Sequence, residues 1–152
     1  ERNDAHWNYQ VDSMGRILGY AREQGVLAAV ENMDSDKEVV SVKDWGDLER
    51  LFSDVGSIEQ WVTLDVTHLR DTDRILSFIA GAGSRIAHVH LSDATAEQMH
   101  LRLGQGSLDL PRIVTALRDA GYRGVWSLEC FIPDNNEEKL REELAKAQAL
   151  FS

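Results

Sequence analysis

Hydrophobic residues along the chain alternate between helical spacing and short continuous runs. From residue 11 to 24, apolar side chains recur about every three or four positions, which predicts an amphipathic helix that ends at Gly25. Residues 26–30 then form an unbroken apolar run, which is typical of a strand covered on both faces. The same alternation continues to the C-terminus, so the pattern indicates helices and strands in strict succession.

The remaining elements are predicted from the same spacing and from their capping residues. Helices are expected after a capping box formed by Ser41 and Asp44, after Asp71 or Thr72, after Asp109, and over residues 137–150. Strands are expected over residues 61–64, 85–91 and 124–128. Strands that alternate with helices call for an α/β fold with a parallel sheet and right-handed crossovers.

The amino-acid composition limits which binding partners and which cellular compartment we expect for this protein. The 152 residues suit one globular domain, and 16 basic against 26 acidic side chains give a formal net charge of −10. This balance makes nucleic acid or an anionic membrane an unfavourable partner. No apolar run approaches the ~20 residues of a membrane span. The single cysteine, Cys130, excludes an internal disulfide and favours a reducing compartment, so we expect a cytoplasmic protein.

Within one residue of the end of each predicted strand lies a polar residue that can bind a metal ion. These residues are Glu31, Asp65, His90 and Glu129. Because side chains alternate across a strand, all four are expected on one face, with their apolar neighbours on the other. In a parallel barrel, that polar face lines the interior at the carboxyl ends of the strands.

Three carboxylates and one imidazole at matching strand ends suit a divalent cation such as Mn²⁺, Mg²⁺, Co²⁺ or Zn²⁺. Without a cation, clustered carboxylates repel one another and resist ionising together. The pattern therefore predicts a metal site.

Further polar residues lie close to these strand ends. His68 and His100 are expected either to reach the cavity or to be solvated in loops. Asp93 is expected to form a turn or to support the site from behind, and His88 to be a hydrogen-bonded core histidine or a neighbour of the substrate. The Gly104–Gly106 segment lacks the setting of a dinucleotide fingerprint and is expected to form a tight turn.

Several stretches together carry a family resemblance. They are Val-Glu-Asn-Met at 30–33, Leu-Asp-Val-Thr-His at 64–68, His-Val-His-Leu-Ser-Asp at 88–93, residues 100–109, and residues 120–129. In this order and spacing the chain resembles the xylose isomerase-like TIM barrels. That family includes sugar phosphate isomerases and epimerases and the family 2 apurinic endonucleases.

The resemblance implies a parallel (β/α) half-barrel that corresponds to strands five to eight of a TIM barrel. It implies that Glu31, Asp65, His90 and Glu129 are metal ligands, and that His68 lies near the substrate or a second metal. A full barrel takes about 250 residues and eight strands. We therefore expect residues 1–152 to form a single domain whose N-terminal half is absent from this chain, completed by that half or by a second copy in a homodimer.

Three functions fit the resemblance. The first is a metal-dependent isomerase or epimerase of a sugar or polyol, in which Glu31 and Glu129 move a proton through a metal-stabilised enediolate and His68 holds a hydroxyl. The second is an apurinic endonuclease-type zinc phosphodiesterase. The third is a non-catalytic half-barrel that dimerises.

Overall fold

The computed structural model describes residues 4–34, 42–56, 60–132, 134 and 136–151. Its helices are α1 (Asp4–Glu23), α2 (Trp45–Val55), α3 (Thr72–Ala82), α4 (Leu110–Asp119) and α5 (Glu137–Leu150), with a short 3-10 helix, η1 (Gly83–Arg85). Its strands are β1 (Val30–Glu31), β2 (Val62–Asp65), β3 (Ile86–Leu91) and β4 (Val125–Leu128). Helices and strands alternate as the hydrophobic pattern predicts.

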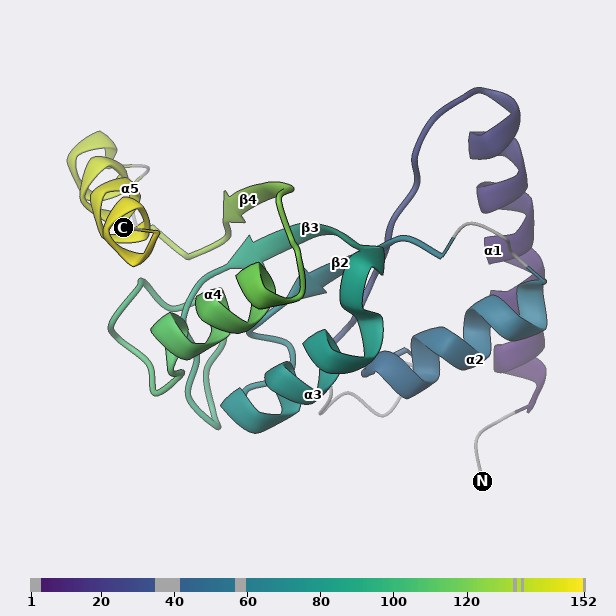
Figure 1. The fold of residues 1–152 in the computed structure, drawn as a ribbon, viewed down its shortest axis with the longest axis horizontal. Helices are drawn as coiled ribbons and strands as arrows, with labels where there is room; N and C mark the ends of the chain where they lie inside the picture. The colour runs from purple at the N-terminus through teal and green to yellow at the C-terminus, as the bar shows by residue number, and fades with distance from the viewer. Residues whose placement is uncertain (1–3, 35–41, 57–59, 133, 135, 152) are drawn as a thin grey trace.

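The strands form one parallel sheet in the order β1-β2-β3-β4. Helices α2, α3 and α4 lie along the same face of this sheet, and α1 and α5 lie at its two ends (Figure 1). Each helix contacts the next one along the chain, from α1 to α5. Consecutive parallel strands backed by consecutive helices form half of a (β/α) barrel, which confirms the predicted fold class.

The hydrophobic core fills the space between the sheet and the helices. Leu64 and Val89, at the strand positions predicted to face the helices, are fully buried. They belong to one apolar cluster with Leu48 of α2, Ile75 of α3 and Ile113 of α4. Burial of such side chains contributes about 1.5–3 kcal/mol each, so this layer holds the sheet in place.

Helix α2 begins differently from the prediction. Ser41, the expected capping residue, lies outside the described residues. Asp44 is the observed N-cap, and its Oδ1 accepts a hydrogen bond from the Asp47 N–H at 3.0 Å. Asp44 therefore acts as the cap itself and not as the third helical residue of a capping box.

Helix α1 begins at Asp4, whereas the spacing predicts a start at residue 11. Trp7 explains the longer helix, because its ring is buried and its Nε1–H donates to Asp54 Oδ2 of α2 at 2.8 Å. Within the described residues, no helix is both long and apolar enough to cross a membrane.

The first strand is shorter than the apolar run predicts. Only Val30 and Glu31 pair with β2, opposite Val62 and Thr63. Val26 and Leu27 are instead more than half exposed, so the expected strand is wrong over residues 26–29 and right only at Val30. An apolar run indicates that burial of its side chains is favourable. In the described part of the chain, however, no strand pairs with residues 26–29.

Candidate metal centre

The polar residues at the strand ends are staggered in the register of the sheet. Glu31 lies level with Thr63, two residues before Asp65. Asp65 lies level with His90, and His90 lies level with the residue two positions before Glu129. Strands in a barrel tilt and stagger against one another, so this offset brings the four side chains to one height on the wall.

The four side chains meet at the carboxyl ends of the strands. Each offers a ligand atom, and these atoms all lie within 4.8 Å of one another. His90 Nδ1 is central: it lies 3.3 Å from Glu31 Oε1, 3.7 Å from Asp65 Oδ2 and 2.5 Å from Glu129 Oε2. The structure thus brings together the whole set of predicted ligands, and their role as ligands stays a prediction.

Two buried atoms in this cluster have no hydrogen-bond partner among the described residues. They are Asp65 Oδ2 and His90 Nδ1, and the short approach of Glu129 to His90 does not follow a hydrogen-bond direction. A buried polar atom without a partner costs about 1–3 kcal/mol, and more if it is charged. A divalent cation held between these atoms would satisfy both, so the donor set fits a metal ion.

The electrostatics of the cluster also favour a cation. Burial raises the pKa of Glu31, and the carboxylates of Asp65 and Glu129 raise it further, while His90 and His68 oppose the rise. A positive ion among these carboxylates would remove the penalty and keep them ionised.

Asp65 is held rigidly by its own loop and by the neighbouring strand. Its Oδ1 accepts hydrogen bonds from the Thr67 N–H at 2.7 Å and the Thr67 hydroxyl at 2.8 Å. The Asn32 side chain exchanges two hydrogen bonds with the backbone of Asp65. Asn32 belongs to a motif of the family resemblance, but sequence reasoning assigned it no role.

His68 faces the cluster with one ring nitrogen. Its Nδ1–H donates to the Asn32 carbonyl at 2.7 Å, which leaves Nε2 as a lone-pair nitrogen 3.8 Å from Asp65 Oδ2. A histidine held by a backbone carbonyl in this way has a fixed tautomer and orientation. His68 is therefore able to bind a cation or a substrate hydroxyl.

His100 completes a second group of potential ligands with Asp65 and His68. It has a positive φ of 54°, and its Nδ1 contacts the Glu129 carbonyl at 3.0 Å. The rings of His68 and His100 pack edge to face, with centroids 5.4 Å apart. The structure thus places His100 at the cavity and not in a solvated loop.

Asp93 serves the loop and not the cluster. Its Oδ1 accepts from the N–H groups of Ala94 and Leu108, and its Oδ2 accepts from those of Gly104 and Gly106, all at 2.9–3.2 Å. These contacts fold the segment around Gly104–Gly106 into a tight turn, as expected. Asp93 acts as a turn organiser.

His88 lies one step deeper in the sheet than His90. Its Nε2 contacts Ser127 Oγ at 2.9 Å, and its ring packs against that of His90 with centroids 5.0 Å apart. Burial and the neighbouring His90 lower the pKa of His88, which favours its neutral form. His88 thus supports the orientation of His90 from below.

Arg70 ties together the loops that follow three strands. Its Nη2 donates to both carboxylate oxygens of the buried Asp34 at 3.0 Å, and its Nη1 donates to the Ala96 carbonyl at 3.1 Å. Sequence reasoning missed this residue, because no local pattern marks a long-range ion pair.

A parallel half-barrel whose strand-end carboxylates and imidazole converge belongs to the class of (β/α) barrels with a polar centre at the carboxyl face. The family described as xylose isomerase-like TIM barrel matches residues 1–150, and the chain belongs to this family. The resemblance seen in the sequence motifs is thereby confirmed.

Two curated relatives illustrate the similarity. A D-psicose 3-epimerase from Enterocloster bolteae is 35% identical over 80 residues, which cover 52% of this chain and 25% of that protein. An uncharacterized protein from Methanocaldococcus jannaschii is 26% identical over 121 residues, which cover 77% of this chain and 41% of that protein. The chain therefore matches less than half of the length of each of these relatives.

Solved structures share the fold. A 3-keto-D-glucoside 4-epimerase from E. coli has a TM-score of 0.75 at 19% identity, over 91% of this chain and 52% of that one. A D-psicose 3-epimerase from Clostridium cellulolyticum has a TM-score of 0.73 at 22% identity, over 95% and 54%. A family 2 AP endonuclease from Brucella melitensis has a TM-score of 0.71 at 17% identity, over 89% and 52%.

Proposed function

We propose that this chain carries the catalytic half of a metal-dependent sugar isomerase or epimerase. The observation that supports it most is the pair of buried atoms without a hydrogen-bond partner, Asp65 Oδ2 and His90 Nδ1, beside two glutamates. The similarity to a D-psicose 3-epimerase supports the choice of a sugar as substrate.

In this proposal, Glu31, Asp65, His90 and Glu129 hold the cation. A bound divalent cation supplies the positive charge that polarises a substrate carbonyl. The family expectation is Mn²⁺, Mg²⁺, Co²⁺ or Zn²⁺, and the mixed oxygen and nitrogen donors are compatible with each.

Glu31 and Glu129 approach His90 Nδ1 from β1 and β4, so they flank the centre. One carboxylate removes the proton from the carbon next to the substrate carbonyl, and the other returns it. His68, fixed by the Asn32 carbonyl, holds a substrate hydroxyl through Nε2.

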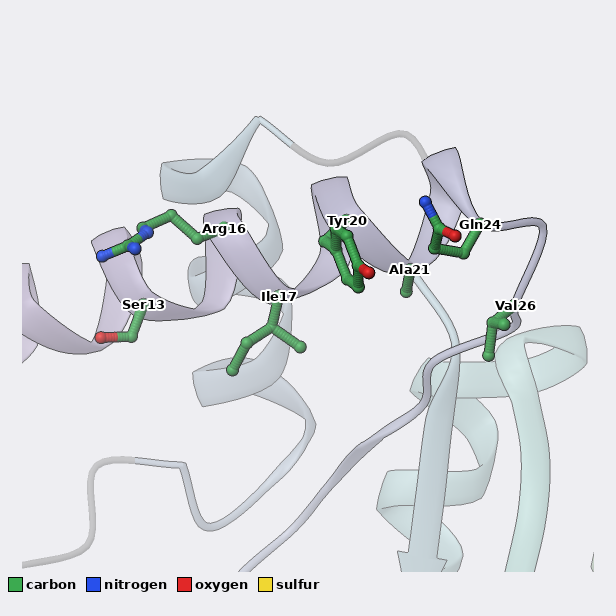
Figure 2. A pocket seen from close by; sticks show the side chains of 7 residues that line it. All are labelled: Ser13, Arg16, Ile17, Tyr20, Ala21, Gln24 and Val26. Carbon is green, nitrogen blue, oxygen red and sulfur yellow. The ribbon is translucent and has the colours of Figure 1, made fainter.

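The half-barrel needs a partner to enclose this chemistry. A hollow of about 700 Å³ runs along α1, where Ile17 and Tyr20 of the helix and Val26 just after it leave apolar surface exposed (Figure 2). We propose that this groove receives the next strand–helix unit of a complete barrel, supplied by a preceding N-terminal half or by a second copy. The solution mass of the chain distinguishes these two sources.

A zinc phosphodiesterase of the apurinic endonuclease type is the second candidate. The group formed by Asp65, His68 and His100 favours it, because it offers a second position for a cation next to the first. The net charge of −10 disfavours binding to a DNA backbone.

One experiment separates the candidates. The purified chain is analysed for metal content and then assayed, with each of several divalent cations, for epimerisation of ketoses and for cleavage of a duplex with an abasic site. Bound metal with epimerisation supports the proposal. Cleavage of the abasic duplex without epimerisation would support the zinc phosphodiesterase in place of the epimerase. A dimer without bound metal and without either activity would support a non-catalytic half-barrel.

A further inference from the structure

A second hollow opens beside the candidate metal centre, between the loops that follow β3 and β4. Its volume is about 620 Å³, within the usual range for small-ligand pockets. Its walls come from the loop after β3, from Phe131 after β4 and from Lys139 in the first turn of α5. Both loops leave the carboxyl ends of their strands, where parallel α/β folds bind ligands.

His100 forms the boundary between this hollow and the metal centre. It lines the hollow, and it also belongs to the ligand group with Asp65 and His68. Its carbonyl accepts the Phe131 N–H at 2.8 Å, and its Nδ1 contacts the Glu129 carbonyl at 3.0 Å. Only the imidazole ring of His100 therefore separates the hollow from the candidate metal centre. The contacts of His100 with the backbone of Phe131 and Glu129 link the walls of the hollow to that centre.

The lining suits a neutral ligand that is rich in hydroxyl groups. Phe131 is 76% exposed, and its ring offers a flat face for stacking. Gln98 and Gln105 add exposed amides that both donate and accept hydrogen bonds. A flat apolar face with amides beside it matches a pyranose ring, which has apolar C–H faces and a rim of hydroxyls.

The charges argue against a phosphate in this hollow. The Arg102 guanidinium is already engaged by Glu142 and Glu143, each at 2.7 Å. Lys139 is the other cation of the lining, and it lies in the same helical turn as the acidic Glu137 and Glu138. A dianionic phosphate would therefore meet at most one available side-chain cation here, Lys139.

We propose that this hollow is a subsite for a second sugar ring, so that the substrate is a glycoside or a disaccharide and not a free monosaccharide. The inference rests on the proposed function, because it takes the metal centre as the place where the first ring reacts. It adds the substrate class that the centre alone does not specify.

The test compares the affinities of D-fructose and of four glucosyl-fructoses that differ in linkage: turanose, maltulose, leucrose and isomaltulose. Binding is measured by calorimetry on the full chain, with and without Mg²⁺. At least one disaccharide is expected to bind about tenfold tighter than D-fructose. Phe131→Ala is expected to remove that advantage and leave the affinity for D-fructose unchanged, and Gln98→Ala with Gln105→Ala to reduce it.

The matched control is Tyr9→Ala, because Tyr9 is a similarly exposed aromatic residue (73%) on α1, outside the lining. It should preserve the preference for the disaccharide. Equal affinities for all five sugars, or an unchanged preference in Phe131→Ala, would overturn the subsite. Tighter binding of D-fructose 6-phosphate than of every disaccharide, lost in Lys139→Ala, would also overturn it in favour of a phosphate site.

These outcomes are separate from failure of the proposed function. If the chain binds no metal, or never epimerises a ketose, the proposed chemistry fails. Disaccharide binding that depends on Phe131 with or without Mg²⁺ would still establish the subsite.

Discussion

The side chain of Asn32 and the backbone of Asp65 form a closed pair of hydrogen bonds between neighbouring strand ends. Asn32 Nδ2 donates to the Asp65 carbonyl at 3.0 Å, and the Asp65 N–H donates to Asn32 Oδ1 at 2.9 Å. Both residues are fully buried. Because Asn32 directly follows Glu31, this pair sets the distance between two of the candidate ligands.

Asn32→Ala is therefore expected to lower both stability and metal affinity. It leaves the Asp65 N–H and carbonyl buried without partners, which costs about 2–3 kcal/mol of unfolding free energy. Asn32→Asp should act similarly, because a carboxylate cannot donate to the Asp65 carbonyl. Urea denaturation and metal titration measure the two effects, with Asn8→Ala on the exposed side of α1 as the control. Unchanged metal affinity in a destabilised Asn32→Ala would show that the pair is structural only.

Glu129→Gln is expected to abolish epimerisation while the metal stays largely bound. The amide keeps an oxygen for the cation but cannot exchange a proton with the substrate. Turnover and metal content are measured on the same preparation, with Glu49→Gln, an exposed change on α2, as the control. Retained turnover would refute the role of Glu129 in proton transfer.

Metal removal is expected to destabilise the native chain but not an Asp65→Asn variant. A cation at a concentration about 100 times its dissociation constant stabilises the folded state by about 2.7 kcal/mol. Asp65 Oδ2 is a buried atom without a hydrogen-bond partner among the described residues, so its replacement by an amide should remove most of this gain. Thermal unfolding with divalent cation and with chelator measures it. Asp12→Asn on α1 should keep the full metal-dependent shift, and an equal shift in Asp65→Asn would contradict the proposed centre.

Gly106→Ala is expected to destabilise the loop that carries His100. An added Cβ would lie 2.3 Å from Asp93 Oδ1 and 2.4 Å from the Ala94 carbonyl oxygen, so the turn around Asp93 would have to open. We expect a loss of about 2–4 kcal/mol, typical of overpacking combined with lost buried hydrogen bonds. The comparison is Gly19→Ala in α1, where no atom lies within 4 Å and about 0.5–1 kcal/mol should be gained. Equal free energies of unfolding for the two variants would contradict the packing described for Gly106.

Glu143 should make stability depend on pH. Burial alone would raise its pKa, but hydrogen bonds from Lys146, the Leu103 N–H and Arg102 outweigh burial and hold the pKa below its ordinary value. A lowered pKa in the folded state stabilises the protein above the unfolded-state pKa of about 4.3, and this contribution is lost as the pH falls through the folded-state pKa.

Glu143→Gln is therefore expected to cost roughly 3 kcal/mol near pH 7 and progressively less below about pH 4. Urea denaturation at a series of pH values measures the difference from the native chain. Glu137→Gln is the control, since its ion pair with Arg141 is 77% exposed on both sides and should contribute about 0–1 kcal/mol. A constant difference across the pH range would show that the charge of Glu143 is not what anchors α5.

The parts that could be predicted from the sequence are those with a local signal. Asp71 and Asp109 cap their helices as predicted, because a cap acts within three residues. The convergence of Glu31, Asp65 and His90 follows from strand alternation together with a parallel sheet.

The parts that could not be predicted depend on partners distant in sequence. The early start of α1 depends on Trp7 and its bond to Asp54, 47 residues away. The roles of Asn32 and Arg70 depend on loops that meet only in the folded chain. Residues 26–29 were predicted as strand from apolarity, which reports a preference for burial and not the presence of a neighbouring strand.

All four residues of the candidate centre come from one continuous stretch of sequence, from Glu31 to Glu129, and lie at the ends of adjacent strands. The four candidate ligands therefore stay together when this stretch of sequence is transferred as one segment to another protein. Under the proposed function, chimeras that join this stretch to different complementary halves are expected to keep the candidate metal centre and its proton transfer, and to change only the surrounding loops.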